Sequence, residues 1–194
     1  MSSSPCPFCN IAANNPPAPL KAPQSKWDPS ESSSNATAHL ILSTKHLLAF
    51  LDIMPLTRGH VLVAPRKHYE MLGDVGVAVG QEMGKWLPIL SRVVTKTVFG
   101  DDPDRHWNVV QNNGERGAQQ VPHVHFHIIP RPNTDSAHKP TFVMFGRGQR
   151  EELDDEEGGS LAKDMRAELA REIDRVQMHE GVDLGLDAKQ RGKL

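Results

Sequence analysis

The chain has few of the features that mark secreted, membrane or nucleic-acid-binding proteins. Its 194 residues include only two cysteines, too few for the disulfide framework of a small secreted domain. No apolar run approaches about eighteen residues, and the N-terminus lacks a basic start followed by an apolar stretch. A net charge of −2 gives no global basic field for DNA or an anionic membrane. We therefore expect a cytoplasmic location, with the nucleus also open, and neither a membrane nor a nucleic acid as partner.

Length and composition favour one domain with additions. An apolar fraction of 38% is ordinary for a folded protein and excludes disorder throughout. We divide the chain into a Cys-x-x-Cys segment (1–13), a Pro/Ser-rich insertion (14–37), a core domain (38–131), and an irregular segment with a C-terminal helix and tail (132–194). The insertion shows neither a helical nor a strand period, so we expect irregular chain there.

Short apolar runs predict the strands of the core. Two runs lie within residues 39–55, and a third, 59–65, is bounded by Gly and Pro. Residues 107–113 predict a fourth strand, and a fifth is expected to begin at Val121 after a polar loop.

Two helices are predicted by apolar residues at three- and four-residue steps. The first covers 76–99 and contains Pro88, which should kink it or release one turn. The second follows Gly159 with Ser160 as N-cap, and the acidic run 151–157 is a solvated loop or a helix start. We expect the tail after Gly181 to fray. The second helix carries one apolar stripe, formed by Leu161, Met165, Leu169, Ile173 and Val176.

Three histidines alternate with apolar residues in VPHVHFHIIP (121–130). Strand residues two apart share a face, so His123, His125 and His127 should point one way and their apolar neighbours the other. An unpartnered buried imidazole costs about 1–3 kcal/mol. Three of them on one face therefore indicate a function.

The spacing of the row favours a division of labour. The outer two histidines would lie about 13 Å apart along a strand, too far to share one metal ion comfortably. A neutral imidazole, with an unperturbed pKa near 6.5, is also a nucleophile towards phosphorus. The face therefore suits phosphoryl or nucleotidyl transfer, with one end of the row left for a metal.

HVHFHII (123–129) resembles the defining motif of the histidine triad (HIT) superfamily. Residues 47–68 and 108–131 resemble its members as well, in particular the nucleotide-binding and dinucleoside-polyphosphate hydrolase branches. The resemblance implies an α+β, HIT-like fold with an antiparallel sheet of about five strands and a long helix, to which the C-terminal helix is added. It also implies a homodimer that binds a purine nucleotide on the sheet.

The same resemblance assigns the catalytic roles. His125 is similar to the nucleophile that attacks the α-phosphorus and forms a covalent nucleotidyl-histidine, which water then hydrolyses. His127 resembles the histidine on the α-phosphate, and His60 the histidine beside the triad.

The nucleotide-binding roles follow from the resemblance in the same way. Asp52 and Ile53 look like the ribose and base contacts, and Asn112 and Gln119 like the polar groups beside the phosphate. Many members have Ser or Thr after this glutamine, whereas here Gln120 follows, so the hydroxyl beside the leaving group is missing.

A structural zinc ion is also implied by resemblance. Some relatives bind zinc through positions that here are Cys6, Cys9, His68 and His123. Two thiolates and two imidazoles form a closed tetrahedral set with no position for water. The alternative is a free thiol pair.

The resulting hypothesis is a hydrolase that cleaves at the α-phosphate of a purine nucleoside phosphoramidate or of a dinucleoside polyphosphate such as diadenosine triphosphate. One alternative is a nucleotide-binding regulatory protein with little catalysis. Another, an enzyme that removes AMP from DNA ends, ranks last because the sequence has no basic patch. Arg147 or Arg150 could reach a second phosphate, although a solvated arginine is the default.

Overall fold

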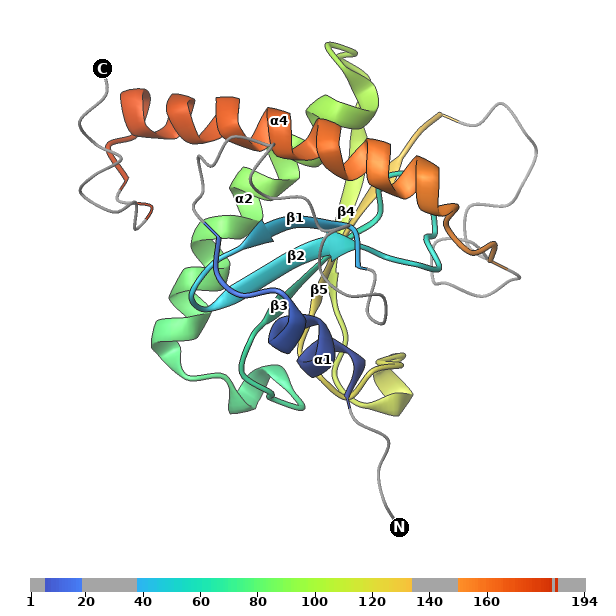
Figure 1. Cartoon of the computed structure of the whole chain (residues 1–194), viewed down its shortest axis with the longest axis vertical. Coiled ribbons are helices and arrows are strands. Elements are labelled where there is room, and N and C mark those ends of the chain that lie inside the picture. The colour runs from blue at the N-terminus through green and yellow to red at the C-terminus, as the bar shows by residue number, and fades with distance from the viewer. Residues whose placement is uncertain (1–5, 19–37, 134–149, 183, 185–194) are drawn as a thin grey trace.

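In the part of the chain that the computed structural model describes, five strands form a single antiparallel sheet, with two long helices on one face and a short helix on the other (Figure 1). The structure describes residues 6–18, 38–133, 150–182 and 184. The sheet order is β1-β2-β3-β5-β4. The α+β class and the five-stranded antiparallel sheet confirm the prediction from sequence.

The strands are short and sit close to where the apolar runs predicted them. They are β1 (Leu40–Ser43), β2 (Leu47–Leu51), β3 (Val61–Pro65), β4 (His106–Gln111) and β5 (Phe126–Arg131). Every neighbouring pair is antiparallel.

Alternation along the strands builds two separate apolar layers. From β2 and β3, one layer takes Leu47, Ala49, Leu51, Val61 and Val63, which pack with helices α2 (Val77–Phe99) and α4 (Asp155–His179). The other layer takes Leu48, Phe50, Leu62 and Ala64, which pack with Phe8 of helix α1 (Pro7–Asn14). β2 and β3 are therefore covered on both faces, and this explains why they are apolar at every position.

The histidine row divides as its alternation predicted. Val124 and Ile128 are buried in the layer beneath α2 and α4, and Phe126 packs against it. His127 pairs with Leu62, whose side chain belongs to the opposite layer. The histidines therefore belong to the face that carries α1.

The start of β5 was predicted wrongly. The strand begins at Phe126 rather than at Val121. The backbone N–H of His123 donates to Val121 O at 2.8 Å, and that of Val124 donates to Tyr69 O at 2.8 Å. Pro122 has no N–H for a ladder bond. The chain therefore turns before it joins the sheet, and only His127 of the row lies within a strand.

The start of α4 was also predicted wrongly. The helix begins at Asp155, and the N-cap is Asp154, whose carboxylate accepts from Glu157 N at 2.9 Å. Three acidic residues in the first turn stabilise the positive end of the helix dipole. The acidic run thus forms the helix start, and Ser160 lies inside the helix. All five residues of the predicted apolar stripe are buried.

Several smaller features complete the comparison. Helix α2 runs through Pro88 without being divided, and short 3-10 turns occur at η3 (Leu72–Asp74) and η4 (Glu115–Gly117). Most of the predicted irregular insertion and of the predicted fraying tail lies outside the described residues, although Leu184 is buried in the core. No helix in the described part of the chain is both long and apolar enough to cross a membrane.

Candidate active site

An open pocket lies on the sheet face that carries α1. Residues far apart in the sequence line it, among them Phe8, Asp52, His60, His125, His127 and Arg150. The polar loop around η4 contributes Asn112, Gln119 and Gln120. Every predicted catalytic and nucleotide-binding residue lines this pocket, whereas the predicted zinc ligands Cys6, Cys9, His68 and His123 do not. Arg147 lies outside the described residues, and Arg150 lines the pocket.

His60 and His127 form a hydrogen-bonded pair of rings. His60 Nε2 lies 2.9 Å from His127 Nδ1, and the backbone N–H of Leu56 donates to His60 Nδ1 at 3.2 Å. Because Nδ1 of His60 accepts this bond, its proton sits on Nε2 and is donated to His127. His127 is then left with its own proton on Nε2. Gly59, directly before His60, has a φ of 83°, and a Cβ there would lie 2.5 Å from Val98 Cγ2, so this position requires glycine.

Burial keeps both rings uncharged. Desolvation, followed by the charges of His127 and Arg150, lowers the pKa of His60 to about 2. Desolvation also lowers the pKa of His127 to about 4, with smaller contributions from His125 and Arg150. At neutral pH the pair therefore consists of neutral hydrogen-bond donors and acceptors.

His125 is held in one tautomer by the backbone. Its Nδ1 lies 2.6 Å from the carbonyl oxygen of His123, which can only accept, so Nδ1 carries the proton. The side chain is almost fully buried, and its ring centroid is 4.7 Å from that of His127. Desolvation lowers the pKa of His125, although the bond to His123 and the charge of Asp52 oppose the shift. The result is a neutral imidazole whose Nε2 carries a lone pair.

Asp52 and Ile53 follow directly after β2, at the pocket rim. Asp52 Oδ1 accepts from Met54 N at 2.9 Å, and Oδ2 lies 3.3 Å from His60 Nδ1. Burial raises the pKa of Asp52, against the lowering effects of the Met54 bond, Arg150 and His125. Ile53 is 55% exposed. An exposed apolar side chain beside a carboxylate is suited to contact a base and a sugar.

Gln119 is part of the loop architecture as well as of the pocket wall. Its Oε1 accepts from Gly114 N, and its Nε2 donates to Glu70 O at 2.8 Å. The amide therefore braces the loop around η4, a role that sequence reasoning missed. Gln120, which follows it, is exposed at the pocket.

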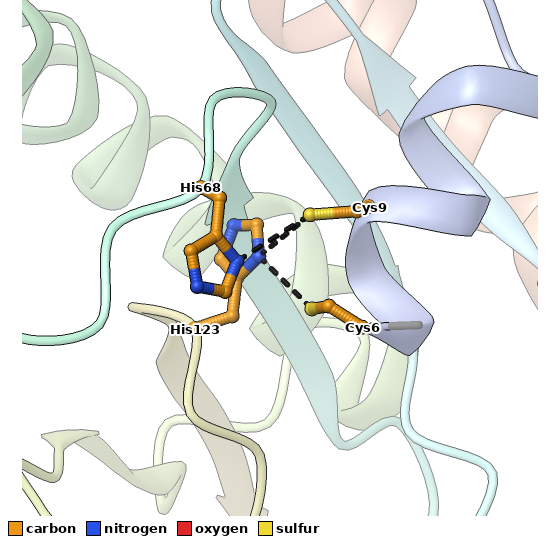
Figure 2. A group of neighbouring side chains, drawn as sticks. All are labelled: Cys6, Cys9, His68 and His123. Atoms are coloured by element: carbon orange, nitrogen blue, oxygen red, sulfur yellow. Dashed lines mark hydrogen bonds between the residues drawn. The ribbon is translucent and has the colours of Figure 1, made fainter. Parts of the chain in front are cut away.

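The four residues predicted to bind zinc form one cluster (Figure 2). His123 Nδ1 lies 3.4 Å from Cys6 Sγ and 3.6 Å from Cys9 Sγ, and His68 Nδ1 lies 3.4 Å from Cys9 Sγ. Sulfur and nitrogen ligands of one tetrahedral zinc ion lie about 3.6 Å apart, given their bond lengths to the metal. The spacing of the cluster therefore fits zinc.

Backbone contacts prepare this cluster for a metal. His123 Nε2 donates to the carbonyl of Pro65 at 2.8 Å, which leaves Nδ1 unprotonated towards the thiols. Arg66 donates to the carbonyls of Ala12 and Asn15 at 2.8 and 2.6 Å, and so fixes the C-terminal end of α1. The helix that contains Cys9, with Cys6 as its N-cap, is thus tied to the chain next to His68.

A second group, Asp52, His60 and His127, also has closely spaced donor atoms. Two imidazole nitrogens on one tetrahedral zinc lie about 3.3 Å apart, whereas those of His60 and His127 are 2.9 Å apart. This spacing is that of a hydrogen bond. The group is therefore a proton-sharing pair beside a carboxylate rather than a metal site.

Phe8 connects the two halves of the site. Sequence reasoning missed this role, and the one signal for it was the position of Phe8 between the two cysteines. Its ring meets His125 edge-on, with centroids 5.1 Å apart, and meets His123 at 5.7 Å. The cysteine-bearing helix therefore also forms one wall of the pocket.

Comparison with known proteins identifies the family. The HIT domain model matches residues 33–134, slightly more than half of the chain. An uncharacterized HIT-like protein of Methanocaldococcus jannaschii is 37% identical over 118 residues, which make up 61% of this chain and 84% of that protein. The chain is a member of the HIT family.

Two further relatives bear on the site. The adenosine 5′-monophosphoramidase of Saccharomyces cerevisiae is 34% identical over 129 residues, 66% of this chain and 73% of that protein. The crystal structure of a Zn-bound histidine triad family protein from Mycobacterium smegmatis aligns with a TM-score of 0.60 at 26% identity, covering 89% of this chain and 97% of that one.

Proposed function

We propose that the protein hydrolyses a purine nucleoside phosphoramidate or a dinucleoside polyphosphate at the α-phosphate, with His125 as nucleophile. The carrying observation is the 2.6 Å contact between His125 Nδ1 and the carbonyl of His123. It holds the ring in the tautomer that leaves Nε2 able to attack. The hydrolase class is supported by the similarity to an adenosine 5′-monophosphoramidase.

The proposed reaction has two displacements at phosphorus. His125 Nε2 attacks the α-phosphorus, and the P–N or P–O bond to the leaving group breaks with its electron pair. The leaving group takes a proton from water, because Gln120 offers no hydroxyl at this position. A second water then attacks the same phosphorus and gives its proton to the hydroxide left by the first. The bond from phosphorus to Nε2 breaks, its electron pair returns to His125, and the nucleoside monophosphate leaves.

Neighbouring groups stabilise the charge that develops at phosphorus. In this proposal His127 donates its Nε2–H to a phosphate oxygen, and His60 holds it in the required tautomer. Asp52 accepts from the ribose hydroxyls and Ile53 contacts the base. Asn112 and the second N–H of the Gln119 amide serve the phosphate side.

Zinc and a second copy of the chain complete the proposal. A zinc ion held by Cys6, Cys9, His68 and His123 would be structural, since all four positions are protein ligands. A homodimer is supported by β4, an edge strand on which Trp107 and Val109 are 41% and 45% exposed. The cytoplasm remains the location that we propose.

Steady-state kinetics with an adenosine phosphoramidate and with diadenosine triphosphate test the function. We expect turnover of one or both, and its loss in His125→Asn with nucleotide binding retained. The exposed His46 supplies a matched control, because it lies in the turn between β1 and β2 and does not line the pocket. Tight nucleotide binding with only background turnover by the wild type would instead favour the regulatory alternative.

A further inference from the structure

Arg150 brings a cationic side chain to the pocket from outside the histidine motif. It lines the pocket together with Asp52, Met54 and His127, and its Nη1 donates to the Met54 carbonyl at 3.2 Å. The segment that follows it is attached to the same rim, because Leu153 N donates to Ile53 O at 2.8 Å. Arg150 is thus held against the loop that carries the ribose-side carboxylate.

The start of α4 reinforces this attachment. Arg58 Nε lies 3.2 Å from Glu157 Oε1 in the first turn of the helix. The Asp154 cap fixes the helix only four residues after Arg150. The contacts of Leu153 and Glu157 therefore hold the chain on the C-terminal side of Arg150 and limit where its guanidinium can reach.

The charge of Arg150 is felt across the site. It opposes the rise in the pKa of Asp52 that burial causes, and it is one of the smaller causes that lower the pKa of His127 and of His60. The charge of Arg150 therefore acts on groups of both the ribose side and the phosphate side of the pocket.

The groups proposed to bind the α-phosphate are uncharged. His60 and His127 are neutral, and Asn112 and Gln119 are amides. Among the described residues that line the pocket, the arginines are Arg116 on η4 and Arg150. Neutral donors suffice for one α-phosphate, whereas a second phosphoryl group brings additional charge that a guanidinium binds well.

We propose that Arg150 binds a second phosphoryl group of the nucleotide, so that the pocket prefers a nucleoside carrying two phosphates to a monophosphate. This inference rests on the proposed function, because it requires a nucleotide in the pocket. The second phosphate has two possible sources: the β-phosphate on the leaving-group side, or a phosphate on a ribose hydroxyl beside Asp52.

Calorimetric titration of the full-length, zinc-loaded His125→Asn protein tests the inference without turnover. The ligands are AMP, ADP and adenosine 2′,5′-bisphosphate. We expect one of the two bisphosphorylated ligands to bind about tenfold more tightly than AMP, the scale of a charge-assisted hydrogen bond. Preference for ADP assigns the β-phosphate, and preference for the bisphosphate assigns the ribose phosphate.

Variants at Arg150 and Arg116 distinguish a specific contact with the second phosphate from a general effect of positive charge in the pocket. Adding Arg150→Gln should abolish the preference while AMP affinity changes less than about twofold, and Arg150→Lys should restore part of it. Arg116→Gln, which removes the same charge from the same pocket, should keep it. The inference is overturned if Arg150→Gln weakens AMP and the preferred ligand equally, if no preference exists, or if Arg116→Gln has the same effect. Absence of any nucleotide binding would overturn the proposed function together with it.

Discussion

Lowering the pH should destabilise the protein through its neutral histidine pair. In the folded protein the pKa of His127 is about 4 and that of His60 about 2, against 6.5 for a free imidazole. The unfolded chain therefore binds more protons than the folded chain below pH 6.5. Each histidine contributes its full stability above that pH and loses it as the pH falls towards the folded-state pKa.

The size of the effect follows from these pKa values. Between pH 8 and pH 5, each of the two rings should cost about 2 kcal/mol of unfolding free energy. His127→Asn removes one titrating ring and keeps a polar group in its place. The loss of stability on acidification should therefore be about 2 kcal/mol smaller in His127→Asn than in the wild type.

Urea unfolding at pH 8 and pH 5, with zinc in excess throughout, measures this difference. His46→Asn is the control, because His46 is an exposed residue in the turn between β1 and β2, and it should behave as the wild type does. If His127→Asn loses as much stability on acidification as the wild type, the burial of a neutral pair is refuted.

Three further predictions concern zinc, α1 and α4. Purified wild-type protein should carry close to one zinc per chain by elemental analysis and Cys9→Ser should carry none; a metal-free wild type would contradict the site. Phe8→Ala should lower the unfolding free energy by about 3 kcal/mol in denaturant titrations, because it empties a buried ring position between Phe50 and His125. A loss no greater than that of a surface substitution would contradict the packing of Phe8 between these two rings. Gly159→Ala should raise the free energy of unfolding by about 0.5–1 kcal/mol, because no atom lies near the new Cβ. Gly158→Ala should lower the free energy of unfolding, because its new Cβ would lie 2.4 Å from His39 Nε2. Equal effects of the two variants in denaturant titrations would contradict the packing of α4 on His39.

Local patterns in the sequence were sufficient to predict the sheet. They also sufficed to predict that the histidines lie on the opposite face from their apolar neighbours. Both depend on side chains two positions apart sharing a face, which holds even where His123 and His125 precede the strand. The start of β5 could not be predicted in this way, because it depends on the bond from Val124 N to Tyr69 O. That partner is distant in the sequence.

Elements held by distant contacts were missed for the same reason. Helix α1 has only eight residues, too few to be stable alone, and Arg66 holds its end. The signal that could have found it was Pro7 in the first turn. The two glycines after the acidic run suggested a later helix start, but Gly158 is required where the helix meets His39.

Trapping the reaction intermediate tests the central claim, that the neutral imidazole of His125 is the nucleophile. Rapid quenching of the wild-type enzyme with excess substrate, followed by intact-mass and peptide analysis at neutral to alkaline pH, should find one nucleotidyl group, bonded to His125. Recovery of the adduct on another residue, or full turnover by His125→Asn, would contradict the account.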